Sequence, residues 1–299
     1  MRDALLRDLS VLPNVQIITT HDNRLSSPMI GSVAIIASDN PADIWRGLLQ
    51  HCDAAFIIAP ETEGKLAGLV ELVTQCNVLH LGCELSAINV ASSKYKTYHR
   101  LLNAGINVVP TYQLNAEILT IDAQRWVVKP DDGAGCDGTV CFESNTKNRA
   151  ELKQLIDTNQ ATHVIQPYVM GIPASISMMC KGEEAWLLAC NLQKVENVDG
   201  RFIYRGGVVN GLTTYHERFA EIANQIAKAM PDLAGYVGVD VIVNADEITI
   251  LEINPRLTTS FAGLHESLGI NPSKLILDVF FDPQFTMPAL NNKSVEVSV

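Results

Sequence analysis

The chain has 299 residues, enough for two or three small lobes that share a large buried core. Hydrophobic residues make up 47% and charged residues 18%, a globular balance that argues against disorder. The formal net charge of −11 disfavours nucleic acid or an anionic membrane as main partner, since both would repel it. No apolar run approaches the roughly 20 residues that a membrane-spanning helix needs. The 7 cysteines include no CxxC pair, so we expect a reducing, cytoplasmic environment.

The first part of the chain alternates short apolar runs with helical patterns. Residues 1–10 read as an amphipathic helix rather than a targeting peptide. The predicted strands are 15–19, 33–37, 54–59 and 78–81, and the predicted helices are 44–51 and 65–75. This alternation indicates a small parallel α/β lobe over residues 1–90. Because such lobes usually begin with a strand, we expect either that a first strand is missing or that the start codon was assigned too late.

The rest of the chain has a different pattern. Residues 86–105 read as helical, with a break near 91–93 and Gly105 as the C-terminal stop. A mainly antiparallel sheet is then expected, with strands at 126–129, 140–142, 163–169, 174–180 and 185–194 and a hairpin at 236–254. Helices are expected at 147–157 and 215–230, and the polar tail from about residue 282 is expected to be loosely held. The predicted fold class is therefore α/β (α+β).

A glycine-rich loop follows the predicted strand that ends at Lys129. Its small residues are Gly133, Ala134, Gly135 and Gly138. The GxGxxG spacing is typical of dinucleotide sites, but those sites need a helix after the glycines, and here 139–142 continue as a strand. A strand–loop–strand flap can instead fold its backbone amides over a triphosphate, with Lys129 as a point charge. The spacing alone does not exclude an ordinary glycine-rich hairpin.

Three oxygen-bearing side chains interrupt the apolar runs of the predicted C-terminal hairpin. Asp240, Glu252 and Asn254 are costly to bury unless a cation offsets their desolvation, and they are the hard ligands that Mg²⁺ prefers. Glu252 and Asn254 share a face by the period of two. Asp240 joins them only if the turn holds three residues, 245–247; a two-residue turn would place it on the opposite face. A solvated hairpin with surface acids is the less favoured alternative.

Further candidate residues lie nearby in the sequence. Arg256 shares the face of Asn254 if the strand continues, and it could stabilise a transferring phosphoryl group or simply pair with an acid. The strand at 163–169 ends in a proline-bearing connection that could expose backbone groups to a base. Arg205, Gly206 and Gly207 form an expected basic turn that could reach an acidic substrate, with a plain hairpin loop as the alternative.

Taken in order, these residues resemble the ATP-grasp superfamily. The resemblance rests on Ser93-Lys94, Gly105 to Pro110, Lys129 with its glycine loop, Gln166 to Val169, and the hairpin with Asp240, Glu252 and Asn254. It runs from about residue 54 to residue 269, and Glu-Ile-Asn-Pro-Arg is its most specific part. It implies a pre-ATP-grasp lobe at 1–90, a lobe with the flap at 91–169, and a C-terminal lobe with the metal hairpin at 170–299.

The resemblance also implies a nucleotide site. Lys94 and Lys129 would hold ATP phosphates beneath the closing loop 133–138. The segment that would meet adenine through its backbone is Gln166, Pro167, Tyr168 and Val169. Many members of the superfamily carry Glu at the position of Gln166, and the N-terminal lobe is short here, so the substrate pocket is less well defined than the nucleotide site.

The implied metal centre uses Asp240, Glu252 and Asn254 to carry one or two Mg²⁺ ions, with Mn²⁺ as an alternative. Arg256 and Lys129 would act in catalysis, Arg256 by stabilising the transition state of acyl-phosphate formation.

The implied activity is an ATP-dependent ligase that joins a small-molecule acid to an amine. Within the superfamily, the runs Lys-Pro-Asp-Asp-Gly-Ala-Gly and Tyr-Arg-Gly-Gly resemble the tyramine–glutamate ligase branch of methanofuran biosynthesis. Two alternatives remain open: a ligase that uses an amino acid as the amine, and a nucleotide-binding sensor without turnover. A protein-kinase-like enzyme is disfavoured, because Lys129 precedes the glycines and no His-Arg-Asp run exists. A homo-oligomer is compatible with the sequence, which does not determine the oligomeric state.

Overall fold

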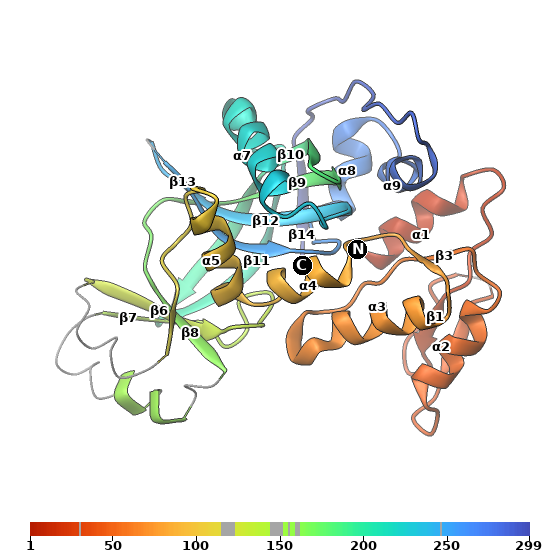
Figure 1. The fold of residues 1–299 in the computed structure, drawn as a ribbon, viewed down its shortest axis with the longest axis horizontal. Helices are drawn as coiled ribbons and strands as arrows, with labels where there is room; N and C mark the ends of the chain where they lie inside the picture. Colours follow the sequence, from red (N-terminus) through yellow and green to blue (C-terminus); the bar gives the residue numbers. More distant parts are fainter. Residues whose placement is uncertain (30, 115–122, 144–151, 155, 159–161, 246) are drawn as a thin grey trace.

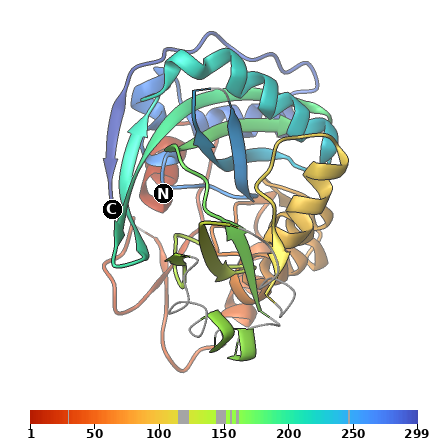
Figure 2. The same ribbon diagram turned by 90° about the vertical axis from the view of Figure 1, so that its left-hand side faces the viewer.

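The protein, seen here in a computed structural model, consists of a large antiparallel sheet with helices on both faces and a small α/β region at one end (Figures 1 and 2). The structure describes residues 1–29, 31–114, 123–143, 152–154, 156–158, 162–245 and 247–299. No helix in the described part combines the length and the apolar character that crossing a bilayer requires.

The N-terminal region contains two short parallel strand pairs and flanking helices. Its elements are α1 (Arg2–Ser10), β1 (Thr20–Asp22), β2 (Val33–Ile35), α2 (Pro41–Leu49), β3 (Ala54–Ala55), η1 (Thr62–Gly64), α3 (Lys65–Gln75), β4 (Leu79–His80) and α4 (Leu85–Ala91). Strand β1 pairs with β2 and β3 with β4, both in parallel. The predicted parallel α/β region and the helix at 65–75 are therefore confirmed.

Several boundaries in this region differ from the prediction; the strand expected at 54–59, for example, covers only Ala54–Ala55. The expected strand at 15–19 is wrong, because pairing with β2 begins only at Thr20. Helix α2 begins at Pro41, three residues before the predicted start at Ile44. The Asn40 side chain accepts a hydrogen bond from the backbone N–H of Ala42, and proline is well suited to the first helical position because it needs no hydrogen-bond donor there.

The central sheet has 10 strands in the described part, in the order β13-β12-β9-β10-β11-β7-β6-β8-β5, with β14 paired to β11. Its strands are β5 (Tyr112–Gln113), β6 (Arg125–Pro130), β7 (Val140–Glu143), β8 (His163–Pro167), β9 (Ile172–Lys181), β10 (Glu184–Val198), β11 (Arg201–Val209), β12 (Gly235–Val243), β13 (Ile248–Asn254) and β14 (Val295–Ser298). Every pairing of these strands is antiparallel, as predicted.

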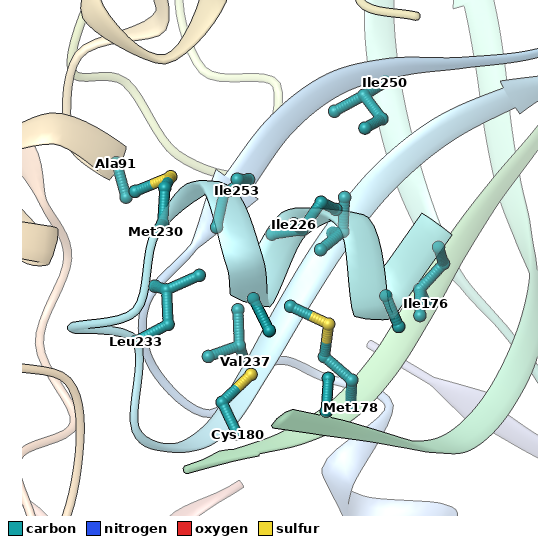
Figure 3. Packing of buried hydrophobic residues seen from close by; sticks show 14 of the residues in the cluster. Ala91, Ile176, Met178, Cys180, Ile226, Met230, Leu233, Val237, Ile250 and Ile253 are labelled. Atoms are coloured by element: carbon teal, nitrogen blue, oxygen red, sulfur yellow. The ribbon is translucent and has the colours of Figure 1, made fainter. Parts of the chain in front are cut away.

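The alternation of side chains along β9 builds a core on each face of the sheet. Ile176, Met178 and Cys180 point towards α7 (His216–Ala229), where Ile226 is fully buried (Figure 3). This core also includes residues of α3, α4 and α5 (Lys94–Asn103). Met179 faces the other way, into a core shared with α1, α8 (Phe261–Leu268) and α9 (Pro272–Phe281). The long strands are thus covered by helices on both faces, which makes them a rigid support.

The smaller end of the sheet, β5 to β8, has its own core around Trp126, Phe142 and Ile165. Described residues 152–154 and 156–158 are helical and contribute Leu152 and Ile156 to that core. The rest of the helix predicted at 147–157 lies outside the described residues. This separate core allows the end that carries the glycine loop to pack independently of the long strands.

The expectation of a loosely held tail is wrong for its last residues. Strand β14 pairs with β11 from Val209 to Gly206, and Val297 packs in the core with α8. At Gly206, φ is +104° and an added Cβ would lie 2.1 Å from the carbonyl oxygen of Val297. Only glycine permits such a close approach of two backbones in this conformation.

We predict that Gly206→Ala displaces β14 and increases hydrogen exchange of the amides at 295–298. The control is Gly182→Ala, since Gly182 also has a positive φ (+60°) but has open space around the added Cβ. The control should show only the backbone cost of roughly 1–2 kcal/mol in unfolding free energy. Unchanged exchange in β14 for the Gly206 variant would contradict the predicted displacement.

Candidate functional site

A cavity of about 260 Å³ opens between the small and the large parts of the central sheet. One side is formed by β6, the glycine loop and residues 166–169, and the other by β9 to β13, Arg256 and residues 258–260. All the residues predicted for nucleotide, metal and phosphoryl transfer line this cavity except two residues of the loop, Ala134 and Gly138. Segments far apart in the sequence therefore meet at one site.

The C-terminal hairpin brings its three oxygen-bearing side chains onto one face. Asp240 pairs directly with Glu252, and the Asn254 amide donates a hydrogen bond to the Asp240 carboxylate at 3.2 Å. The expected condition for this pairing, a three-residue turn, is not met, because the last paired residues are Val243 and Ile248 and four positions lie between them. A β-bulge after Asp240 changes the register by one residue and restores the predicted pairing.

Two lysines flank Glu252 from the opposite side of the cavity. The Nζ atoms of Lys94 and Lys129 lie 3.4 and 3.6 Å from the Glu252 Oε2 atom. Burial lowers the pKa of Lys129, although the charge of Glu252 opposes that shift. Burial also tends to raise the pKa of Glu252, but the two lysines together outweigh it and hold this pKa below its usual range. Glu252 is therefore ionised at neutral pH.

The pKa of Asp240 is shifted in the opposite direction from that of Glu252. Burial, and then the charge of Glu252, raises the pKa of Asp240 to about 7. The hydrogen bonds from Asn254 and from the Gln193 amide, 2.8 Å from Asp240 Oδ1, only partly offset this shift. Two carboxyls this close favour a bound cation, because a cation removes their mutual repulsion.

The donor set of the hairpin fits a hard divalent cation. It offers carboxylate and amide oxygens on one rigid face, whereas a softer metal would favour Cys or His ligands. The described residues contain no group of three or more His, Cys, Asp or Glu side chains that could hold a metal ion. Two carboxylates and an amide oxygen nevertheless suit Mg²⁺, which is usually held by one or two carboxylates together with water and phosphate oxygens.

The glycine loop connects β6 to β7 and does not open a helix, as the sequence predicted. Gly135 and Gly138 have φ values of +67° and +66°, and an added Cβ on Gly138 would lie 3.1 Å from Pro130. The Lys94 ammonium donates a hydrogen bond to the Gly133 carbonyl at 2.7 Å. This contact joins the loop to the lysine pair at the cavity.

Sequence reasoning missed Asp131, which positions Lys94. The Asp131 carboxylate accepts hydrogen bonds from the Ser93 hydroxyl at 2.6 Å and from the Tyr95 backbone N–H at 2.9 Å. Asp131 therefore holds the N-terminus of α5, where a carboxylate also interacts favourably with the helix dipole. The feature of the sequence that could have indicated this role is the pair of acids, Asp131 and Asp132, directly after Lys129-Pro130.

The predicted adenine segment also lines the cavity. The buried Gln166 side chain donates a hydrogen bond to the Thr111 hydroxyl at 2.8 Å. The Tyr168 ring stacks on Phe202, and the Arg125 guanidinium lies 4.0 Å from the centroid of the same ring. These contacts give this wall of the cavity a flat aromatic boundary.

Arg256 lines the cavity but lies outside β13, which ends at Asn254. The condition under which Arg256 would share the face of Asn254, a continuation of the strand, is therefore not met. The guanidinium forms an ion pair with Glu61 of the N-terminal region, with Nη2 and Nε at 2.9 and 3.0 Å from Oε2. A pairing of Arg256 with an acid was one of the two alternatives in the sequence analysis. No local pattern in the sequence identifies the partner, because it lies 195 positions away.

The proposed substrate segment lies elsewhere. Arg205, Gly206 and Gly207 belong to β11, so the expected basic turn is wrong. Arg205 is exposed and pairs with Glu196 at 3.0 Å, while Gly207 allows close approach to the Leu192 carbonyl. The cavity wall does not include these three residues in the described part of the chain.

Comparisons with known proteins agree with this geometry. Residues 91–260 match the family model of the ATP-grasp domain, and residues 15–88 match that of the pre ATP-grasp 3 domain. Tyramine–L-glutamate ligases of Methanocaldococcus fervens and Methanocaldococcus jannaschii are 35% and 33% identical over 218 residues. The alignments cover 72% of this chain and 62% and 59% of those relatives, so the chain spans about three fifths of their length.

A biotin carboxylase from Campylobacter jejuni superposes with a TM-score of 0.77 at 17% identity, covering 96% of this chain and 69% of that one. At this identity the superposition supports the fold alone. The resemblance inferred from the sequence is confirmed by the family match over more than half of the chain. The chain belongs to the ATP-grasp family.

Proposed function

We propose that this protein is an ATP-dependent ligase that converts a carboxylate to an acyl phosphate and joins it to an amine. The observation that carries the proposal is the convergence of Asp240, Glu252 and Asn254 with Lys94 and Lys129 in one cavity next to a glycine loop. A phosphoryl-transfer site needs this combination of metal ligands, cationic groups and a mobile cover.

The proposed cofactors are ATP and Mg²⁺, or Mn²⁺, with one or two ions. Residues 166–169 would meet adenine, and Lys94 and Lys129 would bind phosphate oxygens. Asp240, Glu252 and Asn254 would hold the ion, which supplies charge neutralisation on the phosphates when bound. When phosphate arrives, the lysines can exchange part of their contact with Glu252 for the nucleotide, because both partners are anionic.

The proposed mechanism relies on positioning and electrostatics. A carboxylate is a poor electrophile for an amine, and the γ-phosphoryl group of ATP would convert it to a mixed anhydride. Lys129 and Arg256 would stabilise the negative charge as the phosphoryl group moves. The loop 133–138 would exclude water and protect the anhydride until the amine attacks, which releases phosphate. The products would be an amide, ADP and phosphate.

The substrates that we propose are the γ-carboxylate of L-glutamate and the amine of tyramine. Support comes from the tyramine–L-glutamate ligases that match 72% of the chain. The proposal also retains the three lobes expected at 1–90, 91–169 and 170–299, with the cavity between the second and third lobes. The 7 free thiols agree with a reducing compartment, and we place the reaction in the cytoplasm.

ADP release across a panel of acids and amines tests the function. With MgATP present, we expect turnover with glutamate plus tyramine and none when either substrate is omitted. Turnover only with an amino acid as the amine would replace tyramine in the proposal and leave the ligase chemistry intact. ATP binding without ADP release across the whole panel would contradict the ligase and favour a sensor.

We predict that Glu252→Gln lowers kcat roughly 100-fold or more, because it removes a metal ligand and the counter-charge of two lysines. The protein should remain folded, as judged by its thermal unfolding midpoint. The matched control is Glu247→Gln in the exposed turn of the same hairpin. Equal activity in both variants would remove Glu252 from the site.

Binding of Mg²⁺ should depend on pH through Asp240. Because the pKa of Asp240 is raised to about 7 in the metal-free protein, the carboxyl is mostly protonated below that pH and mostly ionised above it. A proton competes with the ion for the same oxygens, so we expect weaker Mg²⁺ binding at pH 6 than at pH 8. Calorimetric titration measures this, and Asp240→Asn should reduce the difference. Equal affinity at both values would contradict the role of Asp240.

A further inference from the structure

The ion pair between Glu61 and Arg256 joins the N-terminal region to the wall of the cavity. The Glu61 side chain is buried, with 6% exposed, and the Arg256 side chain is partly buried, with 12% exposed. Glu61 lies between β3 and α3, and Arg256 follows β13, so the contact joins elements of different layers. Arg256 lines the cavity, whereas Glu61 is not among the described residues that line it.

Only one oxygen of Glu61 takes part in this contact. Oε2 accepts hydrogen bonds from both Nε and Nη2 of Arg256, whereas Oε1 is buried without a hydrogen-bond partner in the described part of the chain. An unused buried acceptor costs free energy, so this arrangement is not the most stable way to fill the space. The contact therefore calls for an explanation other than stability.

The orientation of the guanidinium offers that explanation. An arginine has five N–H groups in a rigid plane. Two of them bind Glu61, and Nη1 donates a third to the Leu257 carbonyl at 3.2 Å. These contacts fix the plane of the guanidinium, and the remaining N–H groups are left for an anion in the cavity that Arg256 lines.

The segment that carries Glu61 is anchored at the base of the glycine loop. The Asp132 carboxylate accepts a hydrogen bond from the Glu63 backbone N–H at 2.8 Å, and the Thr62 hydroxyl donates to the Asp132 carbonyl at 3.2 Å. Asp132 directly precedes Gly133, the first glycine of the loop. Residues 61–64 thus connect Arg256 with the base of the loop that would cover the nucleotide.

We infer that Glu61 is a positioning residue of the proposed ligase, which holds the Arg256 guanidinium in the orientation that binds the carboxylate substrate as it becomes an acyl phosphate. This inference rests on the proposed function. Glu61 does not touch the substrate itself, because its free oxygen is closed off from the cavity. Its effect on catalysis passes entirely through Arg256.

A double-mutant cycle on kcat tests this inference. ADP release is measured at saturating substrates for the wild type, Glu61→Gln, Arg256→Lys and the double variant. Glutamine keeps the size of Glu61 but loses its charge, and lysine keeps the charge of Arg256 but loses the planar fork. The matched control is Glu63→Gln, because Glu63 lies in the same segment with an exposed side chain paired to Lys65.

We expect Glu61→Gln to lower kcat about 10- to 100-fold, the effect of a small misplacement of a catalytic group. The KM of Glu61→Gln for ATP should stay close to the wild-type value. The kcat of the control, Glu63→Gln, should also stay close to that of the wild type. On the Arg256→Lys background the same change should have little further effect, since the oriented fork is already lost. Glu61→Asp, which keeps the charge, should retain more activity than Glu61→Gln.

An equal loss of kcat on both backgrounds would show a role in lobe packing alone and overturn the inference. Wild-type kcat in Glu61→Gln would also overturn it while leaving the ligase proposal intact. If Glu61→Gln does not fold, Glu61→Ala, which also removes the charge, replaces it in the cycle with the same criteria. A wild-type protein without turnover on any acid and amine pair would instead remove the proposed function, and the inference with it.

Discussion

The interaction on which the site depends is the contact of the Glu252 carboxylate with the ammonium groups of Lys94 and Lys129. The two buried ammonium groups and the partly buried carboxylate would each be costly alone, and their proximity makes the burial tolerable. The charges come from a helix start, a strand end and the C-terminal hairpin, so none can be placed correctly unless all three elements pack. The two ammonium groups outnumber the one ionised carboxylate between them, so an anionic ligand would meet a net positive charge, and a divalent cation could replace the lysines at Glu252.

The two walls of the cavity are packed in different ways. Asp240 and Glu252 stand on the paired strands β12 and β13, whose apolar residues pack in the core with α7, which makes their mutual geometry rigid. The opposite wall has a separate small core, and its glycine loop is joined to the rest through Lys94 and through Asp132. A rigid face that carries the proposed metal ligands, beneath a separately packed cover, is suited to a reaction that must admit substrates and then exclude water.

The described part of the N-terminal region does not line the cavity, but it contacts residues that do or that adjoin them. Glu61 reaches Arg256, Thr62 and Glu63 reach Asp132, and all these contacts come from one short segment. A region that contains no predicted metal or phosphate ligand thereby acts on both the arginine and the base of the loop. In the proposed ligase, this arrangement would let the N-terminal region influence chemistry in a cavity that it does not itself line.

The sequence by itself determined the residue types of the site and most of the elements that carry them, because periodicity and glycine positions are local properties. It predicted that Lys129 precedes a loop between strands and that Asp240 faces Glu252. Only the tertiary structure decided how that register arises, since a four-residue turn and a β-bulge compensate each other. It also decided the pairing of Arg256 with Glu61 and of β14 with β11, because contacts between distant segments depend on how whole layers pack.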